Sequence, residues 1–110
     1  MGKTAVFVLT VLDQLDENPE PCSALIMGHT RELAFQIKRE FDRFTKYFKN
    51  VTTEVIYGGV PKKQHIKMLQ ESPPTIIVGT PGRILDLVQG GQMNLDKLKF
   101  FILDECDKML

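Results

Sequence analysis

The sequence predicts an α/β domain in which helices flank a parallel β-sheet, and two observations carry that prediction. Short continuous apolar runs, each followed by a glycine or an acidic residue, alternate with segments whose apolar residues recur every three or four positions. The runs are typical of strands buried on both faces, and the segments are typical of amphipathic helices. Strands separated by helices form βαβ units, which build a parallel sheet covered on both sides.

Length and composition agree with one globular domain. The chain has 110 residues, of which 43% are hydrophobic and 25% are charged, and this balance excludes a disordered tail, a collagen and a coiled coil. No apolar run approaches the roughly 20 residues of a membrane span, so no membrane partner is expected. Two cysteines far apart in the sequence, Cys22 and Cys106, suggest reduced thiols in an intracellular protein rather than a disulfide framework.

The first half of the chain is predicted as helix, loop, strand and helix. Apolar residues at helical spacing from Ala5 to Leu15 predict the first helix, and the acidic, proline-containing stretch 13–21 predicts a loop. The apolar run 24–27 predicts a buried strand. A helix over 30–48 is predicted because its apolar residues step by three or four positions. These residues are Leu33, Ile37, Phe41, Phe44 and Phe48.

The second half continues the same alternation. Residues 53–57 are predicted as a strand that Gly58 and Gly59 end, followed by a short helix over 61–70. A strand over 75–78, a helix over 81–89 and a last strand over 100–103 complete the prediction.

Four loops with unusual polar residues follow the four predicted strands. In open α/β sheets, ligands bind outside the carboxyl ends of the strands, so these loops should share one edge of the sheet. Because Lys plus Arg equals Asp plus Glu, at fourteen each, a nucleic-acid site must be a local patch.

Gly2, Lys3 and Thr4 open the first predicted helix and match the last three positions of the phosphate-binding P-loop. In that motif, free N–H groups at the helix start and the lysine bind phosphates, while the threonine hydroxyl binds Mg²⁺. The glycine-rich front half of the motif is absent from the sequence. A solvated helix start therefore explains these three residues equally well.

Asp104 and Glu105 follow the last apolar strand. This is the Walker-B arrangement, in which the first carboxylate binds Mg²⁺ and the second orients or deprotonates the attacking water. The alternative is that the two acids are only the polar end of a strand.

Two predicted helices begin with a threonine followed closely by an arginine. These pairs are Thr30 with Arg31, and Thr80 with Arg83, which Pro81 and Gly82 separate. A helix start attracts anions, and an arginine there is unfavourable to the helix dipole unless an anion is near. Plain helix capping remains an alternative.

With the glycines at 58–59, these loops form three places that could hold a phosphate. They resemble a track for a sugar–phosphate backbone, read without sequence specificity because no loop offers an aromatic stacking platform. A basic cluster over 62–67, which includes His65, is better explained as a solvated helix face.

Taken together, the motifs resemble those of the DEAD-box family of ATP-dependent RNA helicases. The segment 2–4 is similar to the tail of motif I, 29–34 to motif Ia and 58–59 to the GG motif. The segment 80–83 is similar to motif Ib and 104–107 to motif II, and the order fits across the whole chain. The resemblance implies a RecA-like P-loop NTPase domain.

The resemblance also implies roles for individual residues. Gly2, Lys3 and Thr4 would bind ATP and Mg²⁺, Asp104 would coordinate Mg²⁺ partly through water, and Glu105 would position the hydrolytic water. Asp107 would link motif II to motifs beyond this sequence. The residues implied to face the RNA backbone are Thr30, Arg31, Gly59, Thr80, Gly82 and Arg83.

Two departures point to a subgroup. Motif II carries Cys106 where most members have Ala, and motif Ia carries His29 where most have Pro. The tetrad Asp-Glu-Cys-Asp is similar to that of helicases acting in nuclear pre-mRNA splicing and mRNA export. The resemblance therefore implies a nuclear protein that meets splicing and export proteins.

By resemblance, residues 1–110 correspond to a part of the first RecA-like domain, and they run from the end of motif I through motif II. The domain is then expected to be truncated at both ends, with no second domain. Alone, such a chain is expected to hydrolyse no ATP usefully, and the missing P-loop strand should leave hydrophobic strand edges open and lower solubility. Two alternatives are another P-loop motor, such as a DNA translocase, and a non-catalytic RNA-binding or interaction module.

Overall fold

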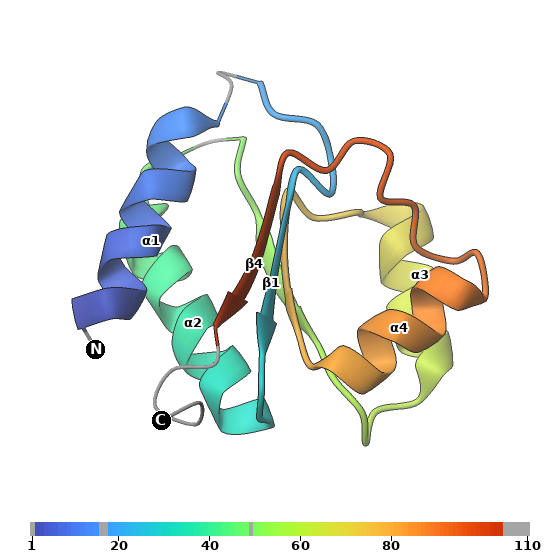
Figure 1. The fold of residues 1–110 in the computed structure, drawn as a ribbon. Helices are drawn as coiled ribbons and strands as arrows, with labels where there is room; N and C mark the ends of the chain where they lie inside the picture. Colours follow the sequence, from blue (N-terminus) through green and yellow to red (C-terminus); the bar gives the residue numbers. More distant parts are fainter. Residues whose placement is uncertain (1, 16–17, 49, 105–110) are drawn as a thin grey trace.

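The computed structural model describes residues 2–15, 18–48 and 50–104, and within them the side chains of all residues but 2–7 and 104. Helices and strands alternate along these residues, as predicted from the sequence (Figure 1). The helices are α1 (Gly2–Gln14), α2 (Arg31–Phe44), α3 (Lys62–Glu71) and α4 (Pro81–Gln89). The strands are β1 (Ala24–Gly28), β2 (Thr53–Ile56), β3 (Ile76–Gly79) and β4 (Phe100–Asp104).

The four strands form one parallel sheet in the order β2-β3-β1-β4. Helices α1 and α2 lie on one side of the sheet, and α3 and α4 lie on the other (Figure 1). The predicted fold class, a parallel sheet with flanking helices, is therefore confirmed.

Each face of the sheet has its own apolar core, because side chains alternate along a strand. On β1, Ala24 and Ile26 pack with Ile37 and Phe41 of α2, whereas Leu25 packs on the opposite face. That opposite face joins β1 to Ile84 and Leu87 of α4. Both cores are nearly free of solvent, which explains why the strands read as continuous apolar runs.

Helix α2 begins as predicted and ends earlier than predicted. The Thr30 side chain accepts a hydrogen bond from the Leu33 N–H at 3.1 Å and caps the helix start. At the other end, the backbone N–H and the hydroxyl of Thr45 both donate to the Phe41 carbonyl, at 2.8 and 2.7 Å. The predicted extension to residue 48 is therefore wrong, and the Phe48 side chain is 46% exposed.

Strand β4 lies at one end of the described sheet and carries two exposed apolar side chains. Phe101 is 57% exposed and Leu103 is 50% exposed. Within the described ranges, no helix is long and apolar enough to cross a membrane.

Candidate nucleotide and nucleic-acid site

The carboxyl ends of the strands and the starts of the following helices lie at one end of the molecule. Figure 1 shows that β1, β3 and β4 end there, and that α1, α2 and α4 begin there. The predicted gathering of loops at a shared sheet edge is therefore confirmed for the loops that the structure describes.

The candidate nucleotide residues fall at this same end. Gly2, Lys3 and Thr4 form the first turn of α1, and Asp104 is the last residue of β4, where it lies in register with Gly28 of β1. First-turn N–H groups have no partner within their helix and attract anions, so the start of α1 fits a phosphate group. Glu105, Cys106 and Asp107 lie outside the described residues.

The turn at 58–60 follows β2 and lies between two arginines from different helices. Gly59 has a φ of +92°, a conformation that glycine adopts without a steric penalty. A Cβ on Gly59 would lie 3.4 Å from Nη1 of Arg31, the first residue of α2. From α4, Nη1 of Arg83 donates a hydrogen bond of 2.9 Å to the Val60 carbonyl. The turn therefore joins motif-bearing loops that are distant in the sequence.

Aromatic rings support the Arg31 side of this turn. The Arg31 guanidinium carbon lies 5.2 Å from the centroid of the Tyr57 ring, a cation–π contact. Tyr57 in turn packs against Phe35 of α2 in an edge-to-face arrangement, with centroids 5.3 Å apart. No motif pointed to Tyr57, although its place at the end of a predicted strand, directly before two glycines, was the signal available.

His65 is buried, contrary to its predicted position. It was predicted on a solvated face of α3, yet it is only 5% exposed. Its Nδ1 accepts a hydrogen bond of 2.9 Å from Nη1 of Arg83. Burial, and next the charge of Arg83, lower the pKa of His65 below its ordinary 6.5. The helical period alone could have placed His65 on the inner face, because it lies four positions before Leu69.

The other predicted RNA-facing residues show different local roles. The Thr30 hydroxyl is used in the cap of α2, as predicted. Thr80 occupies the N-cap position of α4 and Pro81 the first turn, but the Thr80 side chain makes no capping hydrogen bond, so the capping alternative holds for its position alone. Gly82 has open space where a Cβ would stand. Arg83, expected to reach a phosphate, has its Nη1 engaged within the protein.

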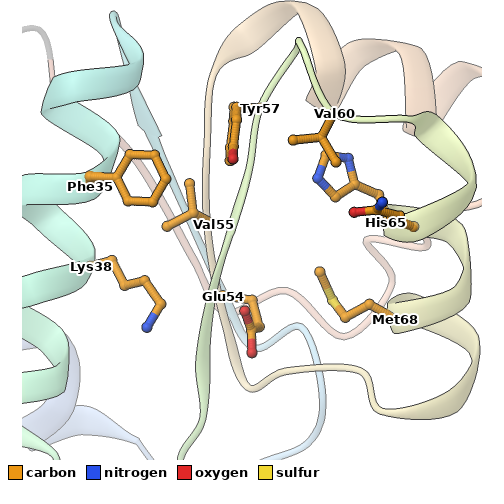
Figure 2. Close-up of a pocket in the computed structure, with 9 residues that line it drawn as sticks. Phe35, Lys38, Glu54, Val55, Tyr57, Val60, His65 and Met68 are labelled. Carbon is orange, nitrogen blue, oxygen red and sulfur yellow. The ribbon is translucent and has the colours of Figure 1, made fainter.

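A pocket of about 350 Å³ opens beside the same turn and surrounds the outer edge of β2. Figure 2 shows Phe35 and Lys38 on one side of β2 and His65 and Met68 on the other, with Tyr57 above Val55 and Glu54 on the strand between them. No motif in the sequence predicted this pocket, because α2 and α3 approach it from opposite faces of the sheet.

Cys22 lies away from this site, in the segment before β1. It is a free thiol among the described residues, and burial raises the pKa of the Cys22 thiol. A raised thiol pKa lowers the thiolate fraction at neutral pH, so Cys22 has the character of an inert packing residue.

Comparisons with known proteins agree with the family that the motifs resemble. The DEAD/DEAH box helicase family matches residues 1–110, and the chain belongs to this family. The ATP-dependent RNA helicase sub2 of Aspergillus terreus is 56% identical over 112 residues, which cover 100% of this chain and 26% of that protein. The corresponding SUB2 of Ajellomyces capsulatus is 54% identical and is covered over 25% of its length.

Two solved structures share the fold. A hypothetical ATP-dependent RNA helicase from Sulfolobus tokodaii superposes with a TM-score of 0.81 at 31% identity, over 98% of this chain and 30% of that chain. The yeast DEAD-box splicing factor Prp28 gives the same TM-score and identity, over 98% of this chain and 27% of its own. The chain thus spans about a quarter of the length of the curated relatives it matches.

Proposed function

We propose that this chain supplies the phosphate-binding end of the nucleotide site and part of the RNA-binding surface of an ATP-dependent RNA helicase. The observation that carries the proposal is the position of the 58–60 turn between Arg31 and Arg83. Three loops that belong to separate βα units meet there at the carboxyl edge of the sheet. Such an edge, with helix starts and glycine turns, suits a phosphate backbone rather than the edges of bases.

On the RNA side, the residues proposed to face the backbone come from these three loops. Arg31 supplies positive charge beside Gly59, and the turn itself can approach a phosphate closely because Gly59 carries no side chain. Thr30, Thr80 and Gly82 complete the surface at the starts of α2 and α4. None of these groups reads a base edge, so binding is proposed to be independent of sequence.

On the nucleotide side, the start of α1 and the end of β4 are proposed to meet the triphosphate and Mg²⁺. Lys3 and the N–H groups of the first turn bind phosphate oxygens, Thr4 and Asp104 hold the metal ion, and Glu105 positions the attacking water. Asp107 connects this end to motifs carried elsewhere in the parent helicase. Bound Mg²⁺ would neutralise charge that develops on the phosphates.

The cellular setting is proposed from names and from motif II. Relatives at 54–56% identity are called sub2 or SUB2, and Prp28 is described as a splicing factor. Together with the Asp-Glu-Cys-Asp tetrad, this supports a nuclear role in pre-mRNA splicing or mRNA export alongside the proteins of those pathways.

A second candidate is a non-catalytic RNA-binding module. It is favoured by one observation: the contacts of Arg31 and Arg83 with the 58–60 turn involve none of the residues proposed to bind ATP. In that case, RNA binding would not require the ATP site at all.

A graft separates these two functions. Residues 1–110 replace the aligned segment of the Aspergillus terreus sub2 protein, and RNA-stimulated ATP hydrolysis is measured. We expect turnover that Glu105→Gln abolishes, and an Arg31→Ala variant that needs about tenfold more RNA for half-maximal stimulation, since a charge-assisted contact is worth about 1.5 kcal/mol.

The controls define the alternatives. Without RNA, ATP binding should be equal in the graft and in Arg31→Ala, because Arg31 lies at the RNA side of the edge. Turnover that persists in Glu105→Gln would contradict the helicase assignment. RNA binding by the 110-residue chain, together with a folded graft that lacks turnover, would favour the non-catalytic module.

A further inference from the structure

His65 is buried beside the proposed RNA-facing edge, and within the described residues its polar contact is with Arg83. Nη1 of Arg83 carries two hydrogens, and the structure gives it two acceptors at 2.9 Å, the Val60 carbonyl and the His65 Nδ1. We call this arrangement the His65–Arg83–Val60 bridge. It ties α3 and α4 to the turn at 58–60, in which Gly59 lies beside Arg31.

The bridge requires one protonation state of the histidine. A guanidinium has donors and no acceptor, so Nδ1 must accept, and the ring proton of neutral His65 must sit on Nε2. When both ring nitrogens carry protons, Nδ1 becomes a donor that faces another donor, and two positive charges stand side by side. The Arg83 contact with His65 cannot survive that change.

The groups around His65 do not compensate for this loss. Tyr57 packs edge-on against the ring, with centroids 6.2 Å apart, and Arg31 adds a second positive charge beyond Tyr57. In the shared pocket, Lys38 lies on the far side of β2 and Glu54 lies on β2 itself. Lys62, on the same helix as His65, binds Asp86 at 3.1 Å. Burial and the Arg83 charge act together, and they keep the pKa of His65 below 6.5.

We propose that His65 is a positioning residue for RNA binding, which as a neutral acceptor holds Arg83 against the 58–60 turn and releases it when protonated. The proposal rests on the proposed function, because it assigns that turn to RNA. Arg83 then acts on RNA mainly through the turn, and Arg31 supplies the direct charge.

The expected pH dependence has a distinctive sign. Acidification makes any protein more positive, and this strengthens binding to a polyanion in general. The bridge predicts the opposite over the range in which His65 gains its proton, because a loosened turn presents its backbone and Arg31 less well. A general charge effect would raise the RNA affinity as the pH is lowered. A fall in RNA affinity on acidification therefore distinguishes the bridge from that effect.

The test measures the affinity of the 110-residue chain for single-stranded oligouridine by fluorescence anisotropy, from about pH 7.5 to about pH 5.5. For the unsubstituted chain, affinity should fall about five- to tenfold, the equivalent of one lost hydrogen bond of ordinary strength. His65→Gln, whose side-chain oxygen still accepts but does not titrate, should bind well with no such fall. His65→Leu should bind weakly throughout.

Two further variants and one spectrum control the result. His29→Gln removes the other histidine and should leave the fall in affinity in place. Arg83→Lys should bind weakly at every pH, because one ammonium cannot reproduce the planar contact. In NMR spectra, the loss of a signal in His65→Gln assigns it to the His65 imidazole. This signal should titrate below pH 6.5, and at neutral pH it should show the Nε2–H tautomer. Circular dichroism confirms that each variant is folded.

The outcomes separate the two levels of inference. Absence of RNA binding by the unsubstituted chain at neutral pH would overturn the proposed RNA surface, and the bridge proposal with it. Binding with the same pH profile in the unsubstituted chain and in His65→Gln would overturn the bridge proposal alone. An Nδ1–H tautomer at neutral pH would also overturn it.

Discussion

The guanidinium of Arg31 lies over the ring of Tyr57, with its central carbon 5.2 Å from the ring centroid. Arg31 opens α2 and Tyr57 directly follows β2, so the contact joins two βα units at the carboxyl edge of the sheet. Arg31 is exposed and lies beside Gly59. The contact with the Tyr57 ring limits the positions that this long side chain can adopt.

Removing the Tyr57 ring should weaken RNA binding through Arg31. Tyr57→Leu is expected to lower the affinity for single-stranded RNA about threefold, which matches a cation–π contact of about 0.5–1 kcal/mol at an exposed site. Tyr57→Phe keeps the ring and should bind within about twofold of the unsubstituted chain. Fluorescence anisotropy at neutral pH measures both variants, and equal losses in the two would contradict a role for the ring.

The two adjacent glycines should respond differently to alanine. Gly59 has a φ of +92°, so Gly59→Ala should lower the free energy of unfolding by about 1–2 kcal/mol. Gly58 has no positive φ, and a Cβ at this position would have no atom within 4 Å. Gly58→Ala should therefore change the free energy of unfolding by about 0.5 kcal/mol or less. Urea unfolding followed by circular dichroism compares them. Equal effects would show that backbone strain at Gly59 is unimportant.

Stability should depend on pH through His65. Its pKa is lowered in the folded chain, so below pH 6.5 the unfolded chain binds the proton first and folding becomes less favourable. The contribution of His65 is fully present above pH 6.5 and is lost as the pH falls toward its folded-state pKa, with a slope of at most about 1.4 kcal/mol per pH unit.

The measurement is the difference in unfolding free energy between the unsubstituted chain and His65→Gln as a function of pH. Carboxylates titrate in both proteins, so their contributions cancel in the difference. The difference should be constant above pH 6.5. Below pH 6.5, the unsubstituted chain should lose stability relative to His65→Gln. A flat difference across this range would contradict the burial of a neutral His65.

The open edge at β4 should promote self-association. Phe101 and Leu103 are 57% and 50% exposed on this strand, and a lysine on an edge strand disfavours pairing with another chain. Phe101→Lys and Leu103→Lys are therefore expected to raise solubility and to lower the weight-average mass measured by sedimentation equilibrium. Leu85→Lys is the matched control, since Leu85 is 56% exposed on α4 and away from a sheet edge. An equal gain from Leu85→Lys would assign the effect to charge alone.

Local patterns predicted most elements of the fold. Apolar runs located all four described strands to within one or two residues, and Thr30 and Pro81 marked the starts of α2 and α4, because capping and periodicity involve neighbours in sequence. The end of α2 was missed because Phe48 continues the apolar stripe, whereas the two Thr45 bonds to the Phe41 carbonyl end the helix four residues earlier, at Phe44.

By itself, the sequence determined the fold class, the family motifs and the edge of the sheet at which they gather, since strand runs, helix starts and motif order are all local features. Only the tertiary structure decided that Arg31 lies on Tyr57 and that Arg83 joins a buried His65 to the Val60 carbonyl. These contacts join residues 18 to 26 positions apart, and they form only once the sheet order β2-β3-β1-β4 brings the loops of separate βα units together.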